Sequence, residues 1–169
     1  GDGDGDVCPD GLPRVAWEDG VMGTVPGSKA GDFSVETITG PFSLKESWTG
    51  CDNYLIIFGG GDSVNPALAS SASSLLFERA GDNTHIIFVS LDDDTSSIDP
   101  WLGVAGWAIP MLGDGALDAW EPRLHFVSVP AAEVGGGLGA YLAAWQAANG
   151  NDSIHALGID RTQRWDDPG

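Results

Sequence analysis

The sequence predicts an α/β fold in which helices cover both faces of one mixed sheet. The first observation behind this prediction is a set of short apolar segments bounded by turn residues, which is typical of strands buried on both faces. These segments are residues 53–58, 84–92, 124–129 and 154–160. The second observation is that segments with helical signals, 66–80 and 138–150, alternate with the strands. Such alternation along a chain favours a sheet with helices on each side.

Both predicted helices carry signals for where they begin and end. Asn65 is a suitable N-cap, Pro66 takes the first helical position, and Gly81 ends the first helix. Gly150 ends the second helix in the same way. We therefore expect the two helices to pack on the faces of the sheet.

The regions flanking these elements predict smaller ones. Residues 32–38 resemble a strand, and residues 40–50 predict a turn followed by a short second element. The sequence "TQRWDD" after the last strand predicts a segment that turns back beside it. We find no internal repeat.

Residues 94–122 are the hardest to interpret. Four residues are expected to interrupt any long helix there: Pro100, Gly103, Gly106 and Pro110. The segment also holds three tryptophans, a residue type more common in cores than on ligand platforms: Trp101, Trp107 and Trp120. Because irregular segments often carry function, we expect any binding surface to lie within this Trp-rich segment, residues 98–121.

The charge of the chain limits its partners. It has 25 acidic residues against 7 basic ones, a net charge of −18. Such a field repels phosphate backbones and anionic lipid surfaces, so we expect neither nucleic-acid binding nor membrane binding. No apolar run approaches the length of a membrane span. The composition instead predicts a solubilising surface on a secreted or salt-adapted protein.

The chain has two cysteines, Cys8 and Cys51, which are 43 residues apart. Both lie in turn sequences, and neither has the close Cys/His neighbours that a zinc site needs. A lone pair in an exported chain favours a disulfide that ties the N-terminal arm to the domain. Two unpaired thiols or a redox pair remain open as alternatives.

Residues 1–31 predict an acidic arm or linker rich in Gly and Pro, preceding a domain of residues 32–169. Its opening places oxygen ligands at alternate positions, as an EF-hand loop does around calcium. These candidate ligands are Asp2, Asp4, Asp6 and Asp10. Pro13 stands where an EF-hand has its bidentate Glu, and the stretch is more similar to the end of a thrombospondin type 3-like run. Calcium is thus a possible cofactor, and a solvated linker is the alternative.

The order of elements resembles a known superfamily. The segments "DFSVETITGPFSLKESWTGCDNYLIIF", "HIIFVSLDDD" and "HALGIDRTQRW" look like successive parts of thioredoxin-like proteins of the thiol-disulfide oxidoreductase, peroxiredoxin and SCO type. The resemblance implies a three-layer sandwich with a mixed central sheet, over about residues 32–165. It also implies that the chain stops before the final helix that such proteins pack on the sheet.

The functional residues of that superfamily do not transfer. Its members carry an attacking cysteine after the central strand, but the matching stretch, Gly59–Pro66, has none. Ser63 is the nearest nucleophile, at a degenerate redox-site position. A serine hydroxyl cannot replace a thiolate in disulfide exchange. The superfamily's cis-proline is also missing before Ile154. With no CxxC pair, no peroxidatic cysteine and no cis-proline signature, the sequence points away from an enzyme.

Three histidines lie at or near the starts of predicted strands: His85, His125 and His155. We expect them along one edge of the sheet, as ordinary strand-edge residues. Two alternatives remain open. With Ser63 and Asp62, one of them would form a hydrolase triad. Together they would form a metal site, which SCO-like relatives build from cysteines and a histidine.

The leading functional hypothesis is a non-catalytic thioredoxin-like module of a larger secreted, bacterial protein, serving interaction or spacing. Its partners would be neighbouring domains of the same parent protein or another protein, outside the cell, on its surface or in the periplasm. The abrupt start inside an acidic repeat predicts an excised piece of a longer polypeptide. The alternatives are a divergent thiol-disulfide oxidoreductase or peroxidase using Cys51 or Cys8, and a calcium-dependent structural or adhesive module.

Overall fold

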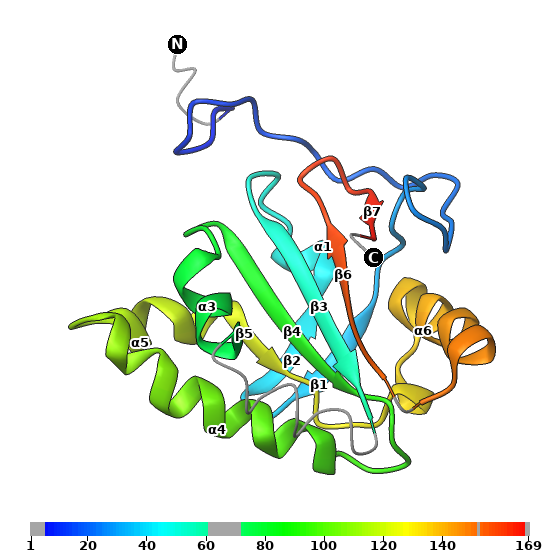
Figure 1. Ribbon diagram of the computed structural model, residues 1–169. Coiled ribbons are helices and arrows are strands. Elements are labelled where there is room, and N and C mark those ends of the chain that lie inside the picture. Colours follow the sequence, from blue (N-terminus) through cyan, green and yellow to red (C-terminus); the bar gives the residue numbers. More distant parts are fainter. Residues whose placement is uncertain (1–5, 61–71, 152, 168–169) are drawn as a thin grey trace.

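The computed structural model in Figure 1 describes residues 6–60, 72–151 and 153–167, and at its centre lies one five-stranded sheet. The strand order is β5-β4-β3-β6-β7. The strands are β3 (Asn53–Gly59), β4 (Thr84–Ser90), β5 (Leu124–Phe126), β6 (Ile154–Ile159) and β7 (Trp165–Asp166). The first three run parallel, while β6 is antiparallel to β3 and β7 is antiparallel to β6. The predicted mixed sheet is therefore confirmed.

Each face of the sheet has its own hydrophobic core, because side chains alternate along the strands. Tyr54, Ile56 and Phe58 of β3 belong to one core, and Ile57 belongs to the other. The elements covering the first face are α6 (Gly136–Asn149) and the hairpin of β1 (Ser34–Thr37) and β2 (Gly40–Ser43). The elements covering the second face are α3 (Ala72–Arg79), α4 (Asp99–Ala108) and α5 (Ala116–Trp120). The result is the expected three-layer arrangement (Figure 1).

The hairpin joins the sheet at a point that the sequence did not predict. Strand β5 is shorter than the predicted 124–129, because the chain leaves β4 after Phe126 and turns to β1. Val127 forms a bridge with Thr37, and the Ser128 N–H donates to the Glu36 carbonyl at 2.9 Å. The short helix α1 (Leu44–Ser47) follows the hairpin, with Ser43 as its N-cap.

The two predicted helices are present where the structure describes them. Helix α6 ends as predicted at Gly150, whose φ of 77° is the left-handed conformation that glycine adopts readily. Helix α3 is described from Ala72 onward, so the predicted start at Asn65 and Pro66 lies outside the described residues.

The prediction that four residues interrupt any long helix within residues 94–122 is wrong for Pro100, Gly103 and Gly106, which α4 includes, whereas α4 ends before Pro110. Short 3₁₀ turns at Ser96–Ile98, Pro110–Leu112 and Glu121–Arg123 flank α4, which has ten residues, and α5. Pro100 lies in the first turn of α4, where a helix tolerates proline. Gly103 and Gly106 lie on its exposed side, so burial of the opposite side stabilises the helix despite them. No helix in the described ranges is long and apolar enough to span a membrane.

The N-terminal arm is fastened to the domain although, in its described residues 6–31, it forms only isolated bridges. The Gly27 N–H donates to the Trp165 carbonyl at 2.7 Å, and the Ala30 N–H donates to the Gln163 carbonyl at 2.8 Å. The Gln163 side chain is buried, and its amide donates to the Ala30 carbonyl at 2.9 Å. This part of the arm therefore packs along β7 and the turn before it.

Gly50 marks a second place where the arm meets the domain. Its φ is +73°, and a Cβ placed there would lie 2.1 Å from the Val15 carbonyl oxygen. The Val15 N–H donates to the Gly50 carbonyl at 3.1 Å. The two backbones therefore approach too closely for any side chain at this position.

We expect Gly50→Ala to lower the free energy of unfolding by about 3 kcal/mol, because it adds a backbone clash to the cost of the left-handed conformation. Gly27→Ala is the matched control. Gly27 has a similar φ of +83° but no atom near the position of a Cβ, so about 1 kcal/mol is expected. Urea unfolding measures both. Equal losses in the two variants would contradict the close approach of Val15.

Candidate functional site

The end of the sheet that corresponds to the redox position of thioredoxin-like proteins lies after β3. The Gly60 N–H donates to the Ser153 carbonyl, just before β6, at 3.3 Å. A Cβ on Gly60 would lie 2.7 Å from the Asp92 Oδ1 and 2.9 Å from the Asn151 carbonyl oxygen. The loops after β3, after β4 and before β6 thus meet at Gly60, where a side chain would not fit. Ser63, the predicted degenerate redox position, lies outside the described residues.

Polar groups at this end of the sheet bind one another. The Ser97 hydroxyl donates to an Asp92 carboxylate oxygen, and the Ser90 hydroxyl donates to the Asp94 carbonyl at 2.7 Å. The Gln146 amide donates to the Leu91 carbonyl. The chain has no thiol here, since both of its cysteines lie elsewhere. The arrangement fixes loops and offers no sulfur nucleophile.

His155 also lies at this end of the sheet. It is on the face of β6 that contributes to the same core as Phe58. Its Nε2 lies 3.0 Å from the Asp167 Oδ1, and the Tyr141 hydroxyl donates to the other oxygen of Asp167 at 3.1 Å. Burial and the Asp167 carboxylate raise the pKa of Tyr141 to about 12, so its hydroxyl stays protonated. The rings of Phe58 and Trp145 lie 5.4 Å from His155. The cluster anchors the C-terminal segment on α6.

The expectation that all three histidines share one sheet edge is wrong. His85, at the start of β4, lies beside Tyr54, whereas His155, at the start of β6, lies beside Phe58 near the other end of β3. The reason is that β6 runs antiparallel to β3, so the start of β6 lies at the opposite end of the sheet. His85 and His125 do lie together. Among the described residues, no group of three or more His, Cys, Asp or Glu side chains is arranged to hold a metal ion.

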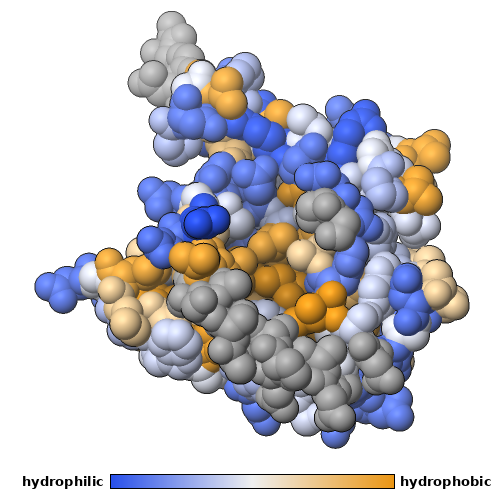
Figure 2. Space-filling view, viewed as in Figure 1, coloured by the Kyte–Doolittle hydropathy of each residue, from blue (hydrophilic) through white to orange (hydrophobic). Residues whose placement is uncertain are grey.

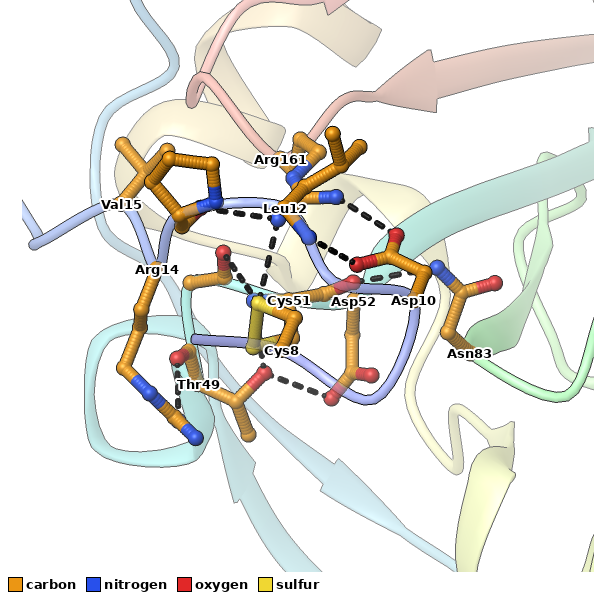
Figure 3. Close-up of a disulfide and its surroundings, with 12 residues drawn as sticks. Cys8, Asp10, Leu12, Arg14, Val15, Thr49, Cys51, Asp52, Asn83 and Arg161 are labelled. Atoms are coloured by element: carbon orange, nitrogen blue, oxygen red, sulfur yellow. Dashed lines mark hydrogen bonds and ion pairs between the residues drawn. A yellow bond between two sulfur atoms is a disulfide. The ribbon is translucent and has the colours of Figure 1, made fainter. Parts of the chain in front are cut away.

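The opposite end of the sheet, before β3, carries the disulfide shown in Figure 3. Cys8 of the arm is bonded to Cys51, with their Cα atoms 5.5 Å apart, and the two residues are only 5% and 6% exposed. Arg161, from the turn after β6, covers it. Its Nη2 lies 3.1 Å from the Cys8 sulfur and donates to the Pro13 carbonyl at 2.9 Å, while its Nη1 donates to Asp10 at 2.8 Å. Sequence reasoning missed Arg161, because nothing local to it indicates this contact.

Asp10, a predicted calcium ligand, is thus engaged within the protein. Its Oδ1 accepts from the Leu12 N–H at 3.0 Å and its Oδ2 pairs with Arg161. These two contacts hold the pKa of Asp10 below its ordinary value, with the Leu12 bond the larger cause. Asp6 is exposed, and the predicted ligands Asp2 and Asp4 lie outside the described residues.

A cavity of about 430 Å³ lies against the disulfide. Its lining residues are Cys8, Pro9, Asp10, Cys51, Asp52, Asp82 and Asn83. Three carboxylates therefore surround the approach to the sulfurs. An attacking thiolate is an anion, and carboxylates within a few ångströms raise its energy. These carboxylates disfavour the approach of a thiolate to the disulfide.

Two stacked histidines adjoin this region from within the sheet. The Nδ1 of His85 lies 3.0 Å from the Nε2 of His125, and the Nε2 of His85 lies 3.5 Å from the Asp52 carboxylate. The Asp52 contact favours a proton on the His85 Nε2, which leaves the His85 Nδ1 to accept from His125. The rings of Tyr54 and Phe42 pack against them. The pair is a half-buried link between β4 and β5.

Burial lowers the pKa of both histidines. For His125 it falls from 6.5 to about 4, with burial the main cause and the neighbouring His85 the second. For His85 burial also dominates, although the Asp52 carboxylate opposes it. A ring whose pKa is lower in the folded protein takes up its proton first in the unfolded chain, which lowers stability as the pH falls below 6.5.

We therefore expect the free energy of unfolding to fall by about 1.5 kcal/mol between pH 6.5 and pH 5 on account of His125. His125→Gln keeps an N–H donor without the titration, so its stability should change less over this range. Thermal unfolding at steps of pH from 6.5 to 5, above most of the carboxylate titration, measures the difference. Parallel profiles for the two proteins would contradict the assignment.

A groove of about 600 Å³ opens on the second face of the sheet beside α3. Leu55 of β3 pairs with Gly158 of β6, and because Gly158 has no side chain, Leu55 stays partly exposed. Leu76 of α3 and Ala80, the residue after α3, form the other apolar wall. Figure 2 shows this apolar surface in a hollow at the centre of the view. Charged lining residues are Arg79, Asp160 and Asp166.

Comparison with known proteins bears on the fold alone. The sequence matches no protein-family model and no curated protein. Among solved structures, the chain is similar to the C-terminal domain of a candidate thiol-disulfide oxidoreductase from Bacteroides thetaiotaomicron, with 12% identity, a TM-score of 0.51 and 84% of each chain covered. It is also similar to a candidate thiol:disulfide interchange protein DsbE from Chlorobium tepidum, with 16% identity, a TM-score of 0.49 and coverage of 85% of this chain and 83% of that one. A third is copper-bound ScoI from Bradyrhizobium japonicum, with 19% identity, a TM-score of 0.42 and coverage of 83% and 88%.

The first of these similarities and the strand order agree. A parallel strand–helix–strand unit, β3-α3-β4, is followed by α6 and the antiparallel pair β6-β7, with β3 at the centre of the sheet. The chain therefore has a thioredoxin-like fold, as the sequence predicted.

Proposed function

We propose that this chain is a non-catalytic thioredoxin-like module of a larger secreted, cell-surface or periplasmic bacterial protein, serving interaction or spacing. One observation carries the proposal. The only two cysteines of the chain form one buried disulfide before β3, whereas the redox cysteines of the resembling proteins follow the central strand. Strand β3 has seven residues, so about 20 Å separates the two places.

The disulfide supports a structural role outside the cytoplasm. Disulfides persist in oxidising compartments, and this one fixes the arm to the domain together with Arg161. In the chain-entropy account, a bridge between residues 43 apart stabilises the folded state by about 4 kcal/mol. A rigidly attached arm sets the distance between the domain and whatever precedes it.

The groove beside α3 supports the interaction role. Its floor is apolar, and Arg79 on one wall faces Asp160 and Asp166 from the side of β6 and β7. A helix with a narrow apolar stripe, flanked by an acidic residue on one side and basic residues on the other, matches these walls. We propose that a helix from a neighbouring domain or a protein partner covers this face.

A divergent thiol-disulfide oxidoreductase or peroxidase is the second candidate, and one contact favours it. The Arg161 guanidinium lies 3.1 Å from the Cys8 sulfur and would stabilise a Cys8 thiolate released by attack on Cys51. Against this stand the burial of both sulfurs and the carboxylates around them.

Redox assays separate the two candidates. We expect the native protein to show no titratable thiol and to leave the rate of insulin-disulfide reduction by dithiothreitol at its uncatalysed level. A Cys8→Ser, Cys51→Ser variant is the matched control and should give the same rate. Reduction of insulin that is faster with the native protein, and that is lost in Cys51→Ser, would overturn the non-catalytic assignment.

A calcium-dependent structural or adhesive role for the arm is a further candidate. With Asp10 held by Arg161, and without a bidentate Glu, the dissociation constant should be weak, in the range of about 10⁻⁴ to 10⁻³ M. Calorimetry with Ca²⁺ should show heat for the native protein and none for an Asp4→Ala, Asp6→Ala variant. Equal heats from both would leave the arm as a solvated linker.

A further inference from the structure

An apolar patch is exposed on the elements between β4 and β5. We call it the α4–α5 patch and define it by Trp107, Met111, Leu112 and Leu117. Met111 is 77% exposed and Trp107 is 50% exposed, and the two leucines are exposed as well. Large apolar side chains exposed on neighbouring elements indicate a candidate interaction site, because monomeric proteins keep exposed apolar patches small.

The geometry of the helices brings these side chains together. The 3₁₀ turn at Pro110–Leu112 continues α4 almost without a break, since the Ile109 N–H donates to the Ala105 carbonyl and the Leu112 N–H donates to the Ile109 carbonyl. Trp107 and Met111 are therefore four residues apart on one helical face. Leu117 follows at the start of α5, which packs against this turn.

The patch stands on a rigid base. On the opposite side of α4, Trp101 is buried and its ring lies 5.1 Å from Phe88 of β4. Trp120 of α5 is buried against Phe77 of α3, with the ring centroids 5.5 Å apart. Because both helices are anchored in the second core, the exposed side chains are held out toward solvent and do not collapse onto the domain.

Two glycines extend the patch along α4. Gly103 lies one turn before Trp107, and Gly106 lies beside it, and no atom lies within 4 Å of where a Cβ would stand on either. This part of the helix surface is flat and bare. A partner backbone can approach it closely while an apolar side chain of the partner packs beside the Trp107 ring.

Charge complementarity indicates the kind of partner. Exposed acids flank the patch residues along the chain, at Asp99, Asp114, Asp118 and Glu121, and residues 98–121 contain no Lys or Arg. The nearest cation in the sequence, Arg123, lies over the Trp120 ring and donates to the Gly81 and Thr84 carbonyls. A partner that matches this surface has an apolar stripe to cover the patch and basic residues on either side of the stripe to pair with the acids.

Other occupants fit less well. A second copy of this chain would bring the same acids to face these ones. An anionic lipid surface would meet a protein of net charge −18. A basic amphipathic helix satisfies both the apolar centre and the charged border, and a Met-containing surface adapts its shape to such helices.

We propose that the α4–α5 patch is a docking surface for a basic amphipathic helix of a protein partner. This inference rests on the interaction role proposed above and adds a surface and a partner chemistry to it. It does not depend on the redox assays, because a thiol activity at Cys8–Cys51 would leave this surface unchanged.

The test uses two designed peptides of identical Leu/Lys composition, one with the leucines on a single helical face and one scrambled. We expect calorimetry to show saturable one-to-one binding of the amphipathic peptide and binding of the scrambled peptide at least about 10-fold weaker. Trp107→Ser with Met111→Ser should weaken the amphipathic peptide by about 10-fold or more. Val25→Ser, which changes an exposed apolar residue of the arm, is the matched control and should bind as the native protein does.

The acidic border is tested in the same way. Asp114→Asn with Asp118→Asn should weaken binding several-fold at low salt, whereas Asp93→Asn, an exposed acid outside the patch, should not. Equal binding of both peptides, or equal effects of the patch and control variants, would mean that the net charge alone attracts the peptide and would overturn the proposal. Dimerisation in sedimentation that is lost in Met111→Ser would overturn it in favour of a second copy.

Discussion

Burial of β3 on both faces is the constraint on which the rest of the structure depends. The strand has hydrogen-bonded neighbours on each side, β4 and β6, and contributes side chains to both cores. It therefore cannot shift or tilt without disturbing both layers of helices. Its two ends are held at a fixed separation, with the disulfide at one end and the turn at Gly60 at the other. The disulfide of this chain therefore lies at the opposite end of β3 from the redox position of the resembling proteins.

The sequence predicted the elements that depend on local pattern and failed where distant partners decide. A strand buried on both faces is apolar along nearly its whole length, so the apolar runs in the sequence predicted the central strands. The residues of β6 do not show whether it runs parallel or antiparallel to β3, and for that reason the predicted position of His155 was wrong. Helix α4 was not predicted because Gly103 and Gly106 have low helix propensity. The helix forms because burial of Trp101 on its opposite side stabilises it by more than the two glycines cost.

The candidate sites show the same division. Two cysteines and a tryptophan-rich segment are conspicuous in any sequence, so both the pairing and the region of the exposed patch could be suggested. Which tryptophan is exposed could not: Trp101 and Trp120 are core residues and Trp107 is not, since only the packing of the two helices distinguishes them. Arg161 lies 153 residues from Cys8 in the sequence, and its contact with the disulfide could not be predicted because the fold alone brings the turn after β6 to the arm.

The way the arm is fastened has a consequence for the environment the protein tolerates. Three guanidinium groups join arm and domain by donating to backbone carbonyls: Arg14 to Thr49, Arg161 to Pro13, and Arg164 to Gly27. A carbonyl is a dipole without net charge, so mobile ions in brine screen these bonds far less than they screen an exposed ion pair. An Asp-rich exterior remains hydrated under the same conditions. These three contacts therefore depend less on salt than the exposed ion pairs of Lys29 with Glu18 and of Lys45 with Asp19.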